Sequence, residues 1–350
     1  MKRLLLPVLL LITLTSFSQP DTLRILFLGN SYTATNNLPS LIDNCLQSLN
    51  VEVISQSYTP GGYTFEGHDG NQTSTNLIQQ GNWDFVVLQE QSQIPSFPLS
   101  QVETECFPFA ASLDNKVEEF NPCAQTVFYM TWGRQNGDSQ NCPNWPPVCT
   151  YEGMDDLLYE RYMTMAEDNE ALVAPVGAVW RFIRTNYPTI NLYSNDGSHP
   201  SIAGSYTAAL TFATVFTEQD PTSIAFNSTL PSTMADSIKS AVKTVVFDQL
   251  PQWNVGVFEN TNPLCATTNS NEHSVETEQK LGYWSNGYYF LPRFEKFSKV
   301  EFYDLQGRLL HSLRPNSSQI ALSLPAGIYL VKGFGISGEI ATHRFVNHSH

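Results

Sequence analysis

The feature that most constrains this chain is a regular alternation of short β-rich runs and longer helical patterns over residues 22–250. Residues 84–88 (DFVVL) are mostly apolar, which is typical of a strand buried on both faces of a parallel sheet. Because strands that alternate with helices form right-handed βαβ units, we predict an α/β fold with a parallel sheet between two helical layers. The predicted strands are residues 23–28, 51–57, 84–88, 125–131 and 172–174, and the predicted helices are residues 38–49, 73–80, 155–169, 175–185 and 201–216.

Both ends of the chain depart from this pattern. Lys2 and Arg3 precede an apolar run and then small residues, which is the arrangement of a secretory signal peptide. The competing interpretation, a buried N-terminal helix, is disfavoured because Pro20 follows at once. The end of the chain contains short strands with turn signals, after a segment rich in Asn, Thr, Ser and Glu. The predicted division is a signal peptide at residues 1–19, a main domain at 22–255, a linker at 256–278 and a small antiparallel β-sandwich module at 279–350.

The net charge of −15 restricts the partners of the chain. The acidic excess lies in residues 1–275, so the predicted main domain would repel nucleic acid and anionic lipid, whose phosphates are bound by Lys and Arg. After the N-terminus no apolar run reaches the roughly 18 residues that a membrane span needs. We therefore expect neither nucleic-acid binding nor stable membrane insertion.

Six cysteines are compatible with disulfides in an exported chain. Sequence alone leaves all connectivities open. We favour a bridge between Cys142 and Cys149, because they bracket a proline-rich loop, and place a bridge between Cys106 and Cys123 second.

Ser31 follows the first predicted strand, and ligands of parallel sheets bind beyond the carboxyl ends of the strands. Alone, such a serine is more often a turn or helix-capping residue, and a nucleophilic serine needs a base within hydrogen-bond reach. Five of the seven histidines lie beyond residue 270, which leaves His68 and His199. Asp196 precedes His199 by three residues, so one loop can offer a base and the carboxylate that orients it. We predict a triad of Ser31, His199 and Asp196, with activity that falls below about pH 6 because the base must be neutral.

The motifs LGNSYT, around Ser31, and DGSHPS, around His199, resemble the first and last blocks of the SGNH (GDSL-like) serine hydrolases, with Asn30 in place of the usual Asp. A secreted branch of that superfamily, marked by GNSYT and DGSHPS, is the nearest resemblance, and it covers about residues 22–250. The resemblance implies a three-layer, flavodoxin-like parallel sheet. It also implies ester hydrolysis through an acyl-enzyme without a metal or other cofactor.

The same resemblance implies an oxyanion hole that includes the backbone of Ser31 and a glycine, either Gly61 or Gly62, of which we favour Gly62. The asparagine of the family's third block is missing from the sequence LQEQS. A glutamine amide can donate the same hydrogen bond, so we expect Gln89, or else Gln91, to replace it. We interpret the intervening Glu90 as a solvated neighbour in preference to a substrate contact.

Three further side chains are candidates for substrate binding, because they follow predicted strands at the catalytic end of the sheet. Tyr32 and Trp132 offer aromatic surface for a sugar, and Arg134 offers a charge for a polar or anionic group. The alternative for each is a packing role within the fold.

The C-terminal sequences YDLQGRLL and LPAGIYLVK resemble the sorting domain of the type IX secretion system. This resemblance implies recognition by that machinery and a secreted or cell-surface location, with passage through the periplasm. The alternative is an accessory module that binds sugar or cell wall.

These observations together predict a secreted serine ester hydrolase, of the carbohydrate esterase or deacetylase type, acting on a small-molecule or polysaccharide ester. Two alternatives remain: a catalytically inactive carbohydrate-binding protein on the same fold, and a lipase- or thioesterase-type acyl hydrolase. The scarcity of histidines in the main domain argues against a zinc enzyme, and Gly29 stands alone where a dinucleotide enzyme needs GxGxxG.

Overall fold

The computed structural model describes two folded parts of the chain. The described residues are 22–258, 265, 283–285, 288–291, 294–304, 308–325, 327–336 and 340–347. The predicted signal peptide and most of the predicted linker lie outside them.

The first part contains a five-stranded parallel sheet, in the order β2-β1-β3-β4-β5. Each predicted strand is confirmed to within a few residues. Four of them are largely buried, whereas the edge strand β2 contains polar residues and has no buried residue. The strands are β1 (Leu23–Leu28), β2 (Val53–Tyr58), β3 (Phe85–Leu88), β4 (Gln125–Tyr129) and β5 (Leu172–Ala174).

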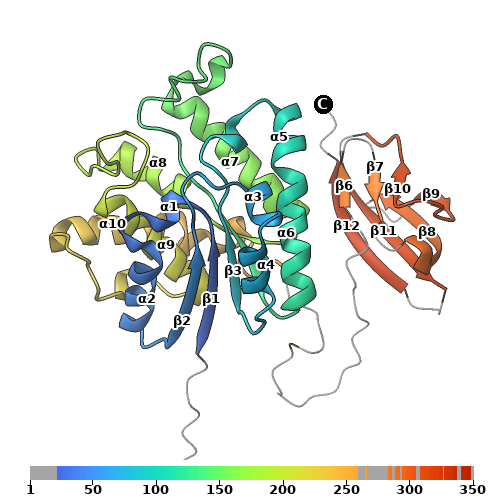
Figure 1. Ribbon diagram of the computed structural model, residues 1–350, viewed down its shortest axis with the longest axis horizontal. Helices are drawn as coiled ribbons and strands as arrows, with labels where there is room; N and C mark the ends of the chain where they lie inside the picture. Colours follow the sequence, from blue (N-terminus) through green and yellow to red (C-terminus); the bar gives the residue numbers. More distant parts are fainter. Residues whose placement is uncertain are drawn as a thin grey trace, which may run out of the picture.

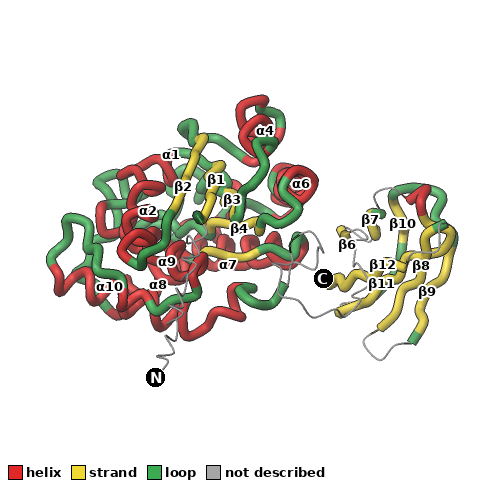
Figure 2. Tube along the Cα trace, turned by 90° about the horizontal axis from the view of Figure 1, so that it is seen from below, coloured by secondary structure: helices red, strands yellow, loops and turns green. Residues whose placement is uncertain are grey.

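Helices cover both faces of this sheet, which confirms the predicted three-layer α/β/α architecture (Figures 1 and 2). Helices α2 and α9 pack together on one face, and α4, α6 and α7 lie on the other. The helices on either side are α1 (Ser31–Ala34), α2 (Leu38–Ser48), α3 (Phe65–Asp69), α4 (Gln72–Ile78), α5 (Leu99–Glu105), α6 (Phe107–Phe120), α7 (Tyr151–Asp168), α8 (Val176–Asn186), α9 (Ile202–Thr217) and α10 (Ser232–Val245). Sequence analysis did not identify α1, α3, α5, α6 or α10.

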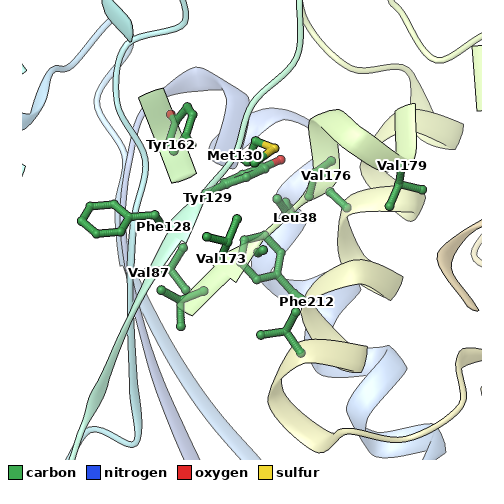
Figure 3. Close-up of a cluster of buried hydrophobic side chains, with 14 of the residues drawn as sticks. Leu38, Val87, Phe128, Tyr129, Met130, Tyr162, Val173, Val176, Val179 and Phe212 are labelled. Carbon is green, nitrogen blue, oxygen red and sulfur yellow. The ribbon is translucent and has the colours of Figure 1, made fainter. Parts of the chain in front are cut away.

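Alternation along the strands distributes apolar side chains to both layers. Phe128 and Tyr129 are neighbours in β4 and point to opposite faces of the sheet, and Phe212 of α9 packs on the Tyr129 side (Figure 3). Both rings of the Tyr129–Phe212 pair are fully buried, in an edge-to-face contact with centroids 4.9 Å apart. The tightly packed sheet therefore supports the loops at its carboxyl edge.

The strand order places a topological switch point at that edge. The chain runs from β1 outward to β2 and then returns to the other side of β1 as β3. The loops after β1 and β3 consequently diverge into different layers, and open α/β sheets bind their ligands at such a point. Ser31 begins α1 directly above it.

The second part consists of two antiparallel sheets, as predicted for the C-terminal module. One has the strand order β10-β7-β6, and the other has the order β12-β11-β8-β9. Residues 305–307, within the sequence YDLQGRLL, lie outside the described residues. The strands are β6 (Tyr283–Ser285), β7 (Tyr288–Phe290), β8 (Phe297–Asp304), β9 (Leu309–Leu313), β10 (Gln319–Ala321), β11 (Gly327–Gly335) and β12 (Ile340–Asn347).

The cysteines confirm one predicted bridge and correct the other. Cys142 and Cys149 form a disulfide, but Cys123 pairs with Cys265. Cys106 is a free, buried thiol that contacts the sulfur of Met165. The predicted Cys106–Cys123 bridge is excluded because the two cysteines flank opposite ends of α6, whose 14 residues span about 21 Å, whereas bridged Cα atoms lie about 5.5 Å apart.

Among the described residues, no helix is both long and apolar enough to cross a membrane.

Candidate active site

Ser31 occupies a tightly constrained turn between β1 and α1. Gly29 precedes it, where a Cβ atom would lie 2.5 Å from Thr33 Oγ1 and 2.8 Å from Gln89 Oε1, so no larger residue fits. Asn30 then caps α1, because its Oδ1 accepts a hydrogen bond from the Tyr32 N–H at 3.1 Å. As the first residue of the helix, Ser31 keeps its own N–H free of the helical hydrogen-bond ladder.

The structure brings Ser31, His199 and Asp196 together in one hydrogen-bonded chain. Ser31 Oγ lies 2.9 Å from His199 Nε2, and His199 Nδ1 lies 2.5 Å from Asp196 Oδ2. The first distance joins two loops that are 168 residues apart in the sequence. The His199 and Asp196 side chains are 36% and 50% exposed, so the chain of contacts is open to a substrate from solvent.

The loop that carries the histidine is built around the carboxylate of Asp196. Its Oδ1 accepts the N–H groups of Ser198 (2.9 Å) and His199 (3.0 Å), and also the hydroxyl of Ser194 (3.0 Å). Gly197 permits this tight turn with a φ of +67°. Partial burial acts to raise the pKa of Asp196, but hydrogen bonds from the His199 ring and these donors hold that pKa well below its usual range. Asp196 is therefore ionised at any pH near neutrality.

A column of stacked aromatic rings supports the histidine loop from below. Tyr32 stacks on Trp132 with ring centroids 4.8 Å apart, and Trp132 stacks on Trp180 at 3.7 Å. The Tyr32 hydroxyl pairs with Ser198 Oγ at 2.7 Å, and Trp132 Nε1 donates to the Ser198 carbonyl at 3.0 Å. The expectation that Tyr32 and Trp132 bind substrate is corrected here, because both are buried and position the loop that carries His199.

The two backbone N–H groups expected in the oxyanion hole are not used within the described fold. Those of Ser31 and Gly62 have no hydrogen-bond acceptor within the described parts of the chain. Gly62 is exposed and has a φ of +70° in the loop that follows β2. Asn30 fixes this loop, since its Nδ2 donates to the Tyr63 carbonyl at 2.9 Å.

Gln89, the favoured third donor of the oxyanion hole, does not complete this site. Gln89 is completely buried, its Oε1 accepts the Asn30 N–H (3.0 Å) and the Thr33 hydroxyl (2.9 Å), and its amide nitrogen donates to the Glu90 carbonyl. It therefore has no surface for a substrate, and the expectation that it donates to the oxyanion is corrected. Gln91 is half-buried, and its amide oxygen accepts the N–H groups of Gln93 and Ile94 in its own loop.

Glu90 is also unlike the solvated neighbour expected from the sequence, because it has no exposed surface. Its carboxylate accepts the Phe65 N–H at 3.1 Å and the Gln91 N–H at 2.5 Å, and so joins the start of α3 to the loop after β3. Burial raises the pKa of Glu90 to about 8, in opposition to these hydrogen bonds. In the sequence, the polar segment LQEQS at the end of a predicted strand was the only sign of these buried polar residues.

His68, the other histidine of the main domain, belongs to this buried layer. Its Nε2 lies 2.9 Å from the Gly29 carbonyl, and its Nδ1 lies 2.8 Å from Ser74 Oγ. Burial lowers its pKa to about 4, so the ring is neutral near pH 7. His68 thereby supports the turn before Ser31 and does not reach solvent.

Arg134 follows β4, and its guanidinium forms a salt bridge within the protein. Its Nη1 donates to Asp138 Oδ1 at 3.0 Å, and Asp138 also accepts the side-chain amides of Gln93 and Asn141. Despite burial, which acts in the opposite direction, these donors lower the pKa of Asp138. Arg134 remains about one-quarter exposed, so a substrate can still reach it.

Within the residues that the structure describes, no three His, Cys, Asp or Glu side chains are grouped in a way that could hold a metal ion.

Comparison with solved structures finds chains of a similar α/β fold. No protein-family model matches the sequence, and the curated proteins contain no match. A DUF4886 family protein from Bacteroides uniformis superposes with a TM-score of 0.54 at 16% identity, over 64% of this chain and 94% of the other. A structure described as a putative SGNH hydrolase from Slackia heliotrinireducens is 30% identical, over 55% of this chain and 98% of the other, with a TM-score of 0.45. An esterase from Pseudoalteromonas is 15% identical over 54% of this chain and 93% of its own length, with a TM-score of 0.39.

Proposed function

We propose that this chain, on its SGNH-hydrolase fold, is a serine ester hydrolase that acts through an acyl-enzyme. One observation carries the proposal: Ser31 Oγ lies 2.9 Å from His199 Nε2, while His199 Nδ1 contacts Asp196 at 2.5 Å. A serine hydroxyl paired with an imidazole whose other nitrogen faces a carboxylate is the arrangement that generates a nucleophile at neutral pH.

The reaction follows from this geometry. His199 Nε2 accepts the Ser31 proton while Ser31 Oγ attacks the ester carbonyl carbon, and the negative charge that develops on the carbonyl oxygen meets the N–H groups of Ser31 and Gly62. His199 then returns the proton to the alcohol as the C–O bond breaks, which leaves an acyl group on Ser31. Water attacks this acyl group with the same histidine as base, releases the acid and restores the serine.

We propose further that the substrate is an acylated carbohydrate, with acetyl as the first acyl group to test. The histidine and its carboxylate are half-open to solvent at the edge of the sheet, which suits a polar ester presented by a large molecule. A signal peptide at residues 1–19 and a sorting module at residues 279–350 would deliver the enzyme to the cell surface through the type IX secretion machinery. Secretion is tested by fractionating a bacterium that has this machinery, with and without residues 279–350, and the proposed route predicts that the shortened chain stays in the periplasm.

The decisive experiment for the esterase is hydrolysis of p-nitrophenyl acetate by the purified chain and by Ser31→Ala. We expect the variant to lose a factor of about 10⁶ in kcat, as when a nucleophile is removed from a catalytic triad. Ser201→Ala is the matched control, since Ser201 caps α9 two residues after His199 but contacts no triad atom. Equal rates for the chain and Ser31→Ala would refute the proposal.

The same assay separates the two alternatives. A carbohydrate-binding protein without activity would be inert in every variant and would still retain saccharides. A lipase- or thioesterase-type enzyme would prefer octanoate to acetate in a series of p-nitrophenyl esters, whereas a deacetylase would show the reverse.

A further inference from the structure

A cavity of about 370 Å³ lies beside the loop that carries His199. It is lined by the end of α8 and by the segment that leads into Ser194, with Gln135 on the opposite wall. The N–H of Gln135 donates to the Gly197 carbonyl at 2.8 Å, so one residue contacts both the cavity and the histidine loop. This volume is within the range of small-ligand sites and suits one sugar unit.

Arg184 brings a positive charge to this cavity. Its guanidinium stacks 3.8 Å from the centre of the Tyr151 ring and 5.3 Å from that of Tyr193, and its Nη2 donates to the Gln135 carbonyl at 3.2 Å. These contacts hold the planar group in place before any ligand arrives, which lowers the cost of binding.

The neighbouring Arg181 shows what is unusual about Arg184. Arg181 lies one turn earlier in α8, and its guanidinium contacts the carboxylates of Asp155 and Asp156, each at 2.6 Å. Arg184 forms no salt bridge with any carboxylate in the described parts of the chain, although the whole chain carries a net charge of −15. An uncompensated, half-buried guanidinium in an acidic protein is suited to an external anion.

The remaining walls restrict the kind of anion. Pro188 is exposed and contributes apolar surface, Asn191 is exposed and polar, and Ile190, Leu192 and Tyr193 are buried beneath them. A bare inorganic ion would leave the apolar wall without a partner. A sugar acid has a carboxylate for the guanidinium, C–H groups for the apolar side and hydroxyl groups for the amide.

We propose that this cavity binds the carboxylate of an acidic sugar, and that the sugar is part of the ester substrate. The second statement rests on the proposed esterase function, whereas the first does not. An acidic sugar held beside residues 194–199 would place an ester on the same or the next sugar unit toward Ser31.

Direct binding tests the first statement without any turnover. The probes are D-glucuronate and, as the neutral match, D-glucose, titrated calorimetrically into full-length Ser31→Ala. We expect glucuronate to bind and glucose to bind at least tenfold more weakly. We expect Arg184→Gln in the same background to lose at least tenfold in glucuronate affinity, since the charge-assisted contact with the carboxylate is lost. Equal affinity in the presence and absence of the Arg184 guanidinium, or no binding of glucuronate, would overturn the proposal.

Two further variants exclude a loss of folding as the cause. Arg184→Lys keeps the charge but loses the planar fork, so it should bind glucuronate with intermediate affinity. Arg24→Gln is the matched control, because Arg24 also lies over an aromatic ring, that of Trp83, but at the amino end of β1, away from the carboxyl ends of the strands. A comparable loss of affinity in Arg24→Gln would count against a specific site.

Kinetics on the wild-type chain test the second statement. Acetylated methyl glucuronoside and acetylated methyl glucoside differ in the carboxylate alone, and we expect kcat/KM to favour the former by about tenfold, a preference that Arg184→Gln removes. If glucuronate binds but this preference is absent, the substrate assignment is wrong and the anion is a separate ligand. If no ester is cleaved at all while glucuronate binding still depends on Arg184, the proposed esterase function fails and the anion site stands.

Discussion

The groups proposed to react and the layer beneath them differ in their exposure to solvent. The side chains of Asp196 and His199 are 50% and 36% exposed, whereas Gln89, Glu90 and His68 have no exposed surface. His199, Asp196 and the half-buried Ser31 are the groups proposed as base, orienting charge and nucleophile. The buried groups contact the turn from which Ser31 projects. The proposed reaction therefore depends on a few solvent-accessible atoms. The positions of those atoms depend on buried polar groups that a substrate cannot contact.

Asp196→Asn tests the exposed region and carries the largest effect among the predictions that follow. An amide at this position can donate to His199 Nδ1, which leaves the proton on Nε2 and prevents that nitrogen from accepting the Ser31 proton. We expect kcat to fall by about 10⁴ with little change in KM, as in other triads with this substitution. Asp220→Asn is the matched control, because Asp220 also caps a short helical turn with its carboxylate but has no contact with the triad. A loss below tenfold for Asp196→Asn would mean that the carboxylate does not orient His199.

Gln89→Met tests the buried layer. The substitution keeps the volume but removes the acceptor of the Asn30 N–H and the Thr33 hydroxyl, so the turn before Ser31 loses two buried hydrogen bonds. A displacement of the nucleophile by about 1 Å is sufficient for a loss of about 100-fold, which we expect in kcat more than in KM. The matched control is Gln91→Met, since Gln91 contacts only its own loop.

The outcome discriminates between two roles for the glutamines. If Gln91→Met loses more activity than Gln89→Met, the glutamine of the third block contacts the substrate after all. Gln89 would still not be that glutamine, because its side chain has no exposed surface.

The exposed region was predictable from sequence because its signals are local. Asp196 and His199 lie three residues apart, and an apolar strand precedes Ser31, so residue type and spacing were enough to propose that they meet. The four largely buried strands, β1, β3, β4 and β5, were predictable for a similar reason, since burial from both faces favours an apolar run.

The buried layer was not predictable because its contacts join distant segments. Glu90 was interpreted as solvated since carboxylates usually are, and nothing in the sequence shows that the Phe65 N–H lies beside it. Tyr32 and Trp132 were assigned to the substrate because strand ends face the site, but the sequence does not reveal that Trp180 completes a stack beneath the loop. The Cys106–Cys123 bridge was predicted wrongly because α6, which separates the two cysteines, was not recognised in the sequence.

Glu90→Gln tests how the buried layer affects the stability of the fold. Burial raises the pKa of Glu90 from 4.5 to about 8, so the folded chain retains a proton that the unfolded chain releases. The stabilisation from Glu90 is therefore complete below about pH 4.5 and is lost as the pH rises toward 8. We expect the free energy of unfolding of the wild type to fall, relative to that of Glu90→Gln, between pH 5 and pH 8 in urea titrations. A constant difference over this range would show that Glu90 does not titrate there.

Tyr32→Phe should have the smallest effect, because it removes one contact between the two regions and leaves the ring stack intact. The Tyr32 hydroxyl pairs with Ser198 Oγ beside His199, and a single hydrogen bond contributes about 1 kcal/mol. We expect kcat to fall by no more than about tenfold, with a midpoint of urea unfolding close to that of the wild type. Tyr58→Phe is the control, because within the described residues the Tyr58 hydroxyl has no hydrogen-bond partner. A loss for Tyr32→Phe as large as that for Asp196→Asn would place the Tyr32 hydroxyl among the reacting groups. Exposure to solvent would then no longer distinguish the groups that react from those that support them.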